Sequence, residues 1–210
     1  MELRDAFDQI TTIRTQLAAT ERLRSLRAVT VALSGFGAIA VAAVQPHVLD
    51  DPMRAPHLYL MLWVGTAVLF ACASTIEVIR RARSGDSALG VANLRLAALQ
   101  FVPSLVAGAV ITAWVATRQT ELLWILPGMW LLLFGLGNLA AQQVLPSAAK
   151  WIGVLYLCSG TWCLWLGEAA LDPWCMGLPF AVGQFPLAGV LWWHHERSER
   201  RGLLEQGGAR

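Results

Sequence analysis

The sequence predicts an all-α membrane protein, an up-down bundle of six transmembrane helices preceded by an N-terminal amphipathic helix. Three observations predict this fold: six long apolar stretches, positive charge gathered on one side of them, and short connections between them. Hydrophobic residues make up 56% of the 210 residues and charged residues only 14%, which leaves little chain for a soluble domain. The formal net charge of +2 gives no indication of nucleic-acid binding.

Residues 1–25 are expected to form an amphipathic helix at the cytoplasmic surface of the membrane. Apolar side chains recur along one face of residues 2–20: Leu3, Phe7, Ile10, Ile13 and Leu17. Four arginines and four acidic residues balance each other through residue 24, and this neutrality disfavours a helix held on anionic lipid by basic charge. We expect residues 2–20 either to cover the inner rim of the bundle or to bind a partner or a second copy of the chain.

The transmembrane domain is predicted to cover residues 26–195. Its six apolar stretches lie near residues 28–48, 57–79, 96–117, 122–142, 150–167 and 174–193. Stretches of about 17–25 residues are long enough to span a bilayer, and an even number of them places both ends on one side. If that side is the cytoplasm, Arg54 and Arg118 alone among the 16 Lys and Arg residues lie outside. We therefore expect a multi-pass protein of the inner membrane with both termini in the cytoplasm.

The connections between the predicted helices are short. Outer loops are expected near residues 49–56, 118–121 and 168–173, and inner loops near residues 80–95 and 143–149. The 80–95 loop contains Arg80, Arg81 and Arg83 and is the one connection with room for a functional element. Residues 196–210 are expected to form a polar, frayed C-terminal tail.

Polar side chains inside the apolar stretches are the first candidates for a site, because a charge at the centre of a membrane helix costs about 2.5–3.5 kcal/mol. They are Glu77, Arg95, Gln100, Asn138, Gln142 and Gln184. Glu77 and Arg95 lie at similar depths on helices joined by one loop, so they can pair. One interpretation is a polar cavity, open to the cytoplasm, that holds a small solute or headgroup. The other is hydrogen bonding between helices, with charged side chains reaching the surface.

The third and sixth apolar stretches share a short motif that ends in proline: Gln-Phe-Val-Pro at residues 100–103 and Gln-Phe-Pro at residues 184–186. A glycine follows each motif within a few residues. Paired breaks of this kind occur in the discontinuous helices of transporters, but both residues are also frequent in membrane helices generally. The pattern therefore indicates either simple kinks or a transport site. The candidate hinge residues are Pro103, Gly108, Pro179, Gly183 and Pro186.

Two histidines and two carboxylates lie in or beside the first outer loop: His47, Asp50, Asp51 and His57. Such side chains can bind a divalent metal ion, but their spacing matches no metal motif. The sequence Asp-Asp-Pro at residues 50–52 is instead typical of a turn before a helix. We therefore expect no metal and no other cofactor.

The cysteines form no Cys-x-x-Cys pair and all fall in or beside apolar stretches. They are Cys72, Cys158, Cys163 and Cys175. We expect them to be buried free thiols that behave as small hydrophobic residues.

Together these features favour a non-enzymatic regulatory or accessory membrane protein, in which residues 2–20 and the basic 80–95 loop bind a cytoplasmic or membrane partner. The alternative is a small carrier or channel for an uncharged or amphiphilic solute, lined by Gln100, Asn138, Gln142 and Gln184. A membrane enzyme is the least supported class, and no catalytic residue is assigned. The expected partners are the lipid bilayer and another protein or a second copy, and not nucleic acid.

Overall fold

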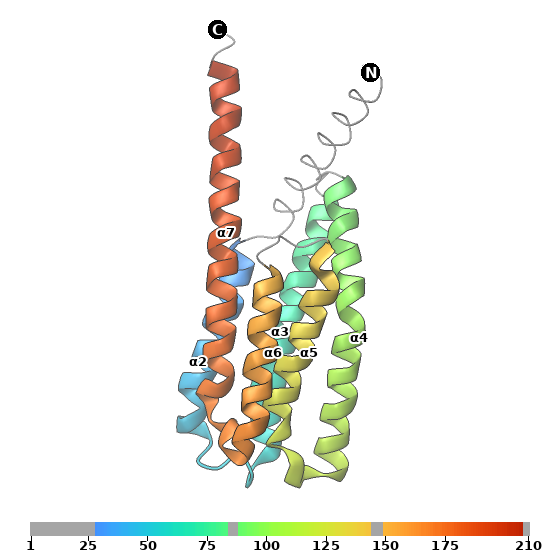
Figure 1. Ribbon diagram of the computed structural model, residues 1–210, viewed down its shortest axis with the longest axis vertical. Helices are drawn as coiled ribbons and strands as arrows, with labels where there is room; N and C mark the ends of the chain where they lie inside the picture. Colours follow the sequence, from blue (N-terminus) through green and yellow to red (C-terminus); the bar gives the residue numbers. More distant parts are fainter. Residues whose placement is uncertain (1–27, 84–87, 144–148, 208–210) are drawn as a thin grey trace.

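The computed structural model describes residues 28–83, 88–143 and 149–207, and within these ranges the chain is all-α, with no strand (Figure 1). The helices are α2 (Ala28–Val48), α3 (Pro56–Arg83), α4 (Ala88–Arg118), α5 (Ile125–Ala140), α6 (Ala149–Leu166) and α7 (Pro173–Gly207). Three short 3-10 helices join or extend them: η1 (Thr120–Leu122), η2 (Ala141–Gln143) and η3 (Gly167–Leu171). The prediction of an all-helical chain is confirmed.

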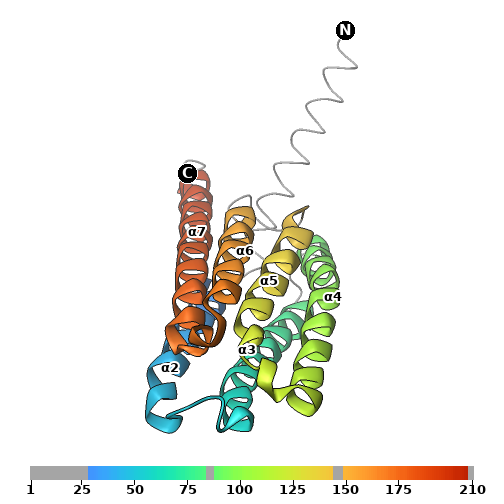
Figure 2. The same ribbon diagram turned by 60° about the horizontal axis from the view of Figure 1, so that its bottom comes forward.

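The helices run up and down between two ends of the bundle (Figure 1). At the end that we call the capped end lie the 49–55 connection, η1 and η3. At the opposite end, called the open end, α2 begins and α7 finishes (Figures 1 and 2). The described chain therefore has the antiparallel topology that short connections predict.

Local sequence explains how helices start and stop at the capped end. Both α3 and α7 begin with a proline, which suits the first helical position because that residue needs no backbone donor. The side chain of Asp172 accepts a hydrogen bond of 2.9 Å from the backbone N–H of Trp174 in the first turn of α7. Gly167 follows the last residue of α6 with φ of 61°, a left-handed conformation that glycine adopts without strain.

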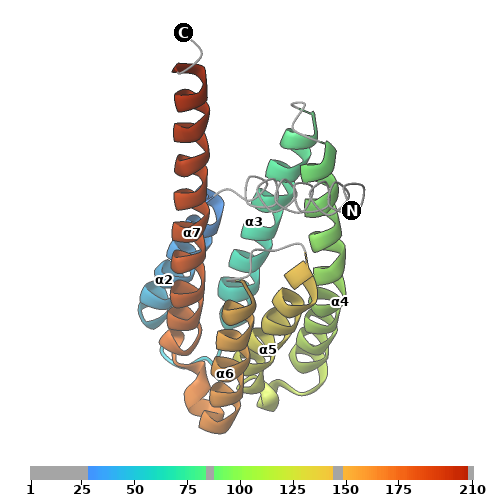
Figure 3. The ribbon, with the colours of Figure 1, turned by 45° about the horizontal axis from the view of Figure 1, so that its top comes forward.

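Side-to-side packing divides the bundle into two tight pairs and one looser hairpin. Helix α2 packs along α7, and α5 packs along α6. The α5 and α6 backbones nearly touch, since a Cβ atom on Gly160 would lie 2.8 Å from the carbonyl oxygen of Gly128. Helices α3 and α4 form the hairpin, and α4 also packs against α5. In Figure 3, α3 and α4 lie side by side toward the open end, away from α7.

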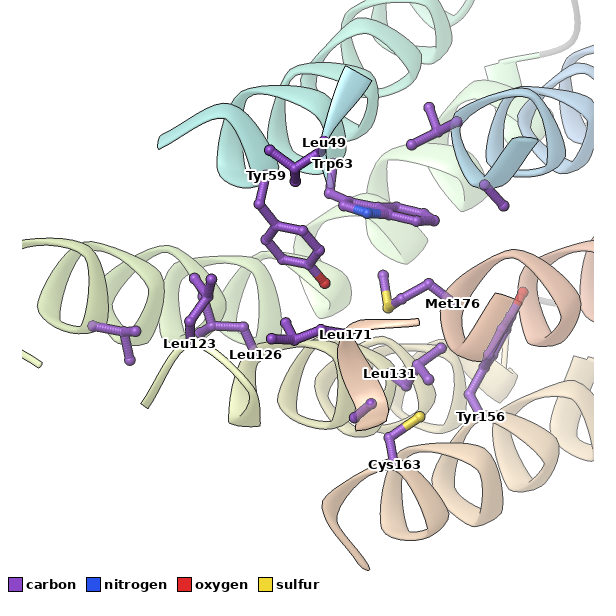
Figure 4. Close-up of a cluster of buried hydrophobic side chains, with 14 of the residues drawn as sticks. Leu49, Tyr59, Trp63, Leu123, Leu126, Leu131, Tyr156, Cys163, Leu171 and Met176 are labelled. Carbon is purple, nitrogen blue, oxygen red and sulfur yellow. The ribbon is translucent and has the colours of Figure 1, made fainter. Parts of the chain in front are cut away.

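A cluster of buried hydrophobic side chains, shown in Figure 4, includes Leu49, Leu123 and Leu171 from the connections at the capped end. It includes side chains from all six described α-helices and from the connections at the capped end. The residues labelled in Figure 4 are Leu49, Tyr59, Trp63, Leu123, Leu126, Leu131, Tyr156, Cys163, Leu171 and Met176. The Tyr59 and Trp130 rings stack with their centroids 6.3 Å apart. This end of the bundle is therefore the packed core.

Four of the described helices contain segments long and apolar enough to cross a membrane: Val29–Val48, Pro56–Glu77, Arg95–Arg118 and Lys150–Leu171. Helix α5 is apolar but has only 16 residues, because η1 and η2 take up the ends of the predicted 122–142 stretch. Prolines, glycines and Gln184 lower the hydropathy of the membrane-length part of α7. The chain thus contains helices suited to a membrane, and the count of six spans remains a proposal.

Two expectations about the open end are corrected. Helix α3 continues to Arg83 and α4 begins at Ala88. Most of the expected 80–95 loop is therefore helical, and the connection is reduced to residues 84–87. The expected polar tail continues α7 as helix to Gly207, consistent with its many helix-forming Glu, Arg and Leu residues. The predicted N-terminal helix at residues 1–25 lies outside the described residues.

Candidate functional site

A layer of aromatic rings crosses the interior of the bundle and joins four helices. Phe134 of α5 is at its centre, with ring centroids 5.1 Å from Phe101 of α4, 5.0 Å from Tyr156 of α6 and 5.2 Å from Phe180 of α7. The first two contacts are edge-to-face, an arrangement that the quadrupoles of aromatic rings favour. We call these four residues the aromatic layer.

Three of the predicted polar residues border the aromatic layer on its open-end side. Asn138 and Gln184 each follow a ring of the layer by one helical turn, and both are buried, with 8% of their surface exposed. Gln100 immediately precedes Phe101 on α4, which runs in the opposite direction. The fold therefore gathers these three amides, from three different helices, around the same layer.

The hydrogen bonds of these amides differ. Gln184 Nε2 donates to the Tyr156 hydroxyl at 3.2 Å and so ties α7 to α6. Asn138 Nδ2 donates to the carbonyl oxygen of Phe134 at 3.0 Å, within its own helix. Gln100 Oε1 is buried and has no hydrogen-bond partner among the described residues. A buried acceptor without a donor costs free energy. Among the three amides, Gln100 is the one with such an unsatisfied oxygen.

The other predicted polar residues lie elsewhere. Glu77 is half-buried near the open end of α3, whereas Arg95 on α4 and Gln142 in η2 are exposed. The pairing of Glu77 with Arg95 stays a prediction. The six residues therefore do not form one cluster: three amides surround the aromatic layer and the rest lie nearer the surface.

A second buried polar group, Gln45 in α2, was not predicted from the sequence. Its Oε1 accepts a hydrogen bond of 2.7 Å from Trp63 Nε1 of α3, and its Nε2 donates to the carbonyl oxygen of Leu171 in η3 at 3.0 Å. One side chain thus joins α2, α3 and η3 at the capped end. In the sequence, the only indication of this contact is a single glutamine beside Pro46 at the end of an apolar stretch. That pattern does not show which residues the glutamine would contact.

The candidate hinge residues lie within continuous helices. Helix α4 runs through Pro103 and Gly108, and α7 runs through Pro179, Gly183 and Pro186. Gly183 has a packing role, because a Cβ atom there would collide with the hydroxyl of Tyr156. Neither helix is broken at these residues, although kinks remain compatible with this continuity.

The histidines and carboxylates of the first outer loop do not converge on a common centre. Asp51 Oδ1 accepts the backbone N–H of Met53 at 2.9 Å, and its Oδ2 lies 3.2 Å from Arg54 Nε. His47, Asp50 and His57 are exposed. Within the described ranges, no three His, Cys, Asp or Glu side chains are arranged to hold a metal ion. The Asp51 contacts are those of a turn.

One surface also qualifies as a candidate site. We call it the α3 face, a part of α3 exposed around nearly its whole circumference: Ala67, Val68, Leu69, Ala71, Cys72, Ala73, Ser74, Thr75 and Ile76. On one side of it Phe70 is half-buried, and its ring occupies the space that a side chain at Gly37 of α2 would fill.

Among the described residues, the interior of the bundle buries three amide side chains and no charged one. Such an interior can stack against and hydrogen-bond a neutral group, but it supplies no buried carboxylate or histidine to transfer a proton. Comparison of the chain with protein-family models, curated proteins and solved structures found no match to any of them.

Proposed function

We propose that this chain is a six-span inner-membrane protein, with both termini in the cytoplasm, that acts without catalysis as a regulatory or accessory subunit. In this proposal the α3 face binds a transmembrane helix of another membrane protein. The observation that carries the proposal is the exposure of α3 around nearly its whole circumference, from Ala67 to Ile76. Helices α5 and α7 complete the six spans, because they run between the same two ends as the four apolar helices (Figure 1).

The membrane-length parts of α3 and α4 are much less covered than those of α2 and α6. In an apolar 18-residue stretch of each helix, 11% of the residues are buried in α3 and 0% in α4, compared with 28% in α2 and in α6. Lipid can cover such surfaces, but lipid association requires no particular side chains. The composition of each surface therefore decides which of them is suited to a protein contact.

Small residues distinguish the α3 face. It contains Ala67, Ala71, Ala73 and Ser74, and nothing lies within 4 Å of a Cβ atom placed on neighbouring Gly65. Small side chains let two membrane helices approach closely enough for dispersion contacts, which drive association where the surrounding lipid is equally apolar. The exposed surface of α4 carries larger aliphatic residues, including Leu105, Val106 and Val110, which suit contact with lipid chains.

The cytoplasmic part of the proposed contact lies at the open end. Arg80 and Arg83 are exposed on the last turns of α3, directly beyond the α3 face. We propose that this basic end meets an acidic segment of the partner, with residues 2–20 adding an apolar contact. Positive charge at this end also favours its placement in the cytoplasm.

The test places a photo-crosslinking amino acid in native membranes at Val68 or at Val182 of α7, which are equally exposed at 54% and 53%. We expect a protein adduct from position 68 and lipid adducts alone from position 182. Ala71→Trp should abolish the protein adduct, whereas Ala109→Trp on exposed α4 should leave it unchanged. Lipid adducts alone at both positions would contradict the proposal, and an adduct of twice the chain's mass would identify the partner as a second copy.

Deleting residues 2–20 tests their contribution separately. Partner recovery in mild detergent should fall when the segment is removed. Unchanged recovery would exclude the segment from the contact while leaving the α3 face to be judged by crosslinking.

A second candidate function is a carrier for an uncharged or amphiphilic solute. The unpaired Gln100 Oε1 favours it, because a hydrogen-bond donor of the solute would bind this oxygen. Gln184→Leu and Asn138→Leu should then abolish uptake into liposomes while the fold survives. Full uptake by both variants would eliminate the carrier. If neither the unaltered protein nor the variants transport, the accessory function is favoured.

A further inference from the structure

Cys163 and Cys175 lie on either side of η3 at the capped end. Cys163 is one turn before the end of α6, and Cys175 is the third residue of α7. The Cys163 thiol donates to the backbone carbonyl oxygen of Cys175 at 3.6 Å. The Cys175 thiol also lies 3.7 Å from the carbonyl oxygen of Ala169 in η3. The fold thus brings together two thiols that are twelve residues apart in sequence.

We propose that Cys163 and Cys175 are a redox pair that closes into a disulfide by exchange with the oxidised form of a thiol–disulfide oxidoreductase. The inference rests on the proposed orientation, which places the capped end outside the cytoplasm, in a compartment where disulfides form and persist. Both cysteines are free thiols in the structure, so the described state is the reduced one.

Exposure assigns different roles to the two sulfur atoms. Cys175 is half-buried, whereas Cys163 retains only 2% of its surface. The Cys175 thiolate attacks the disulfide of the oxidant and forms a mixed disulfide, releasing one oxidant thiolate. The Cys163 thiolate then attacks the Cys175 sulfur of the mixed disulfide and expels the second thiolate of the oxidant. The pair loses two electrons and two protons, and the oxidant gains them as a dithiol.

A closed bond would join α6 to α7 directly across η3. The loop between them ends at Leu171, whose carbonyl oxygen accepts the hydrogen bond from Gln45. Cross-linking a loop restricts the unfolded chain, so the oxidised protein should melt at a higher temperature than the reduced one. The redox state would thus set the rigidity of the capped end.

The deciding experiment uses the full-length protein in detergent, fully reduced and then exposed to oxidised glutathione. Free thiols are alkylated and the peptides are analysed by mass spectrometry. We expect a peptide pair joined through Cys163 and Cys175 and lighter by two hydrogen atoms. Cys72 and Cys158, which are exposed on the surfaces of α3 and α6, serve as internal controls and should not join each other. Glutathione adducts on Cys175 without the joined pair would overturn the proposal.

Variants and intact cells separate failure of the pair from failure of the orientation. Cys175→Ala should leave Cys163 unoxidised, and its melting temperature should no longer respond to glutathione; the Cys72→Ala/Cys158→Ala variant should respond like the unaltered protein. A membrane-impermeant maleimide added to intact cells, with a reporter cysteine at exposed Asp50, reads the orientation alone. If Asp50→Cys is not labelled while the purified pair still closes, the orientation is wrong and the pair is right.

Discussion

Helix α3 is built in two different ways along its length. Near the capped end Tyr59 and Trp63 are buried, one stacked on Trp130 and the other hydrogen-bonded to Gln45. A turn further on, from Ala67, the same helix is exposed around nearly its whole circumference. The first part holds the bundle together, whereas the second contributes little to internal packing. Substitutions in the two parts should therefore separate stability from partner binding.

The largest contrast is expected from removing one large side chain in each part of α3. Tyr59→Ala removes a ring that is 1% exposed and leaves a cavity, which should cost about 3–5 kcal/mol of unfolding free energy. Leu69→Ala removes a side chain that is 66% exposed and should change the unfolding free energy by less than about 0.5 kcal/mol. Denaturant titration in mixed micelles measures both. Equal losses would show that the α3 face is packed against the bundle.

Glycine substitutions sharpen the same comparison. A Cβ atom at Gly160 would lie 2.8 Å from the backbone oxygen of Gly128, so Gly160→Ala should force α5 and α6 apart at a cost of about 1–3 kcal/mol. Gly65→Ala meets open space and gains helix propensity, which should stabilise α3 by about 0.5–1 kcal/mol. Thermal melting in detergent compares the two variants. A destabilising Gly65→Ala would show that a neighbouring helix closely approaches that position.

Hydrogen bonds give a smaller contrast. Gln45→Leu leaves the Trp63 indole N–H and the Leu171 carbonyl without their partner and should cost about 1–2 kcal/mol. Thr75→Val removes a hydroxyl that donates only to Ala71 of its own helix, so the expected change is close to zero. Tryptophan fluorescence of Gln45→Leu should also shift, because the environment of Trp63 changes. No change in either signal would remove the structural role of Gln45.

The local structure was largely predictable from the sequence, and the tertiary contacts were not. The apolar stretch at residues 28–48 matches α2, and that at 150–167 differs from α6 by one residue at each end, because hydropathy follows membrane-length helices. The prediction of a loop at 80–95 rests on its charged residues, and it misses that α3 continues through 80–83 and that α4 already includes 88–95. Arginine, leucine and alanine are good helix formers, and α4 continues through the single Gly90.

The candidate sites show the same limit. The sequence identifies Gln100, Asn138 and Gln184 as polar residues inside apolar stretches, and the fold places them around one aromatic layer. The contact of Gln45 with η3 and that of Cys163 with Cys175 depend on how α2, α6 and α7 meet at the capped end. Helix-to-helix pairing of this kind is set by the shape of side chains in three dimensions, and no motif spacing encodes it.

The smallest effect concerns the start of α7 at the capped end. Asp172 accepts a hydrogen bond from the Trp174 backbone N–H at 2.9 Å, and its negative charge faces the positive end of the helix dipole. Asp172→Ala removes both interactions and should cost about 1 kcal/mol, whereas Asp172→Asn keeps the acceptor and should cost only about 0.3 kcal/mol. Thermal melting at low and high salt separates the two contributions, because salt screens the dipole interaction and leaves the cap. If both variants lose the same stability and high salt removes the loss, the charge dominates and the hydrogen bond to Trp174 is secondary.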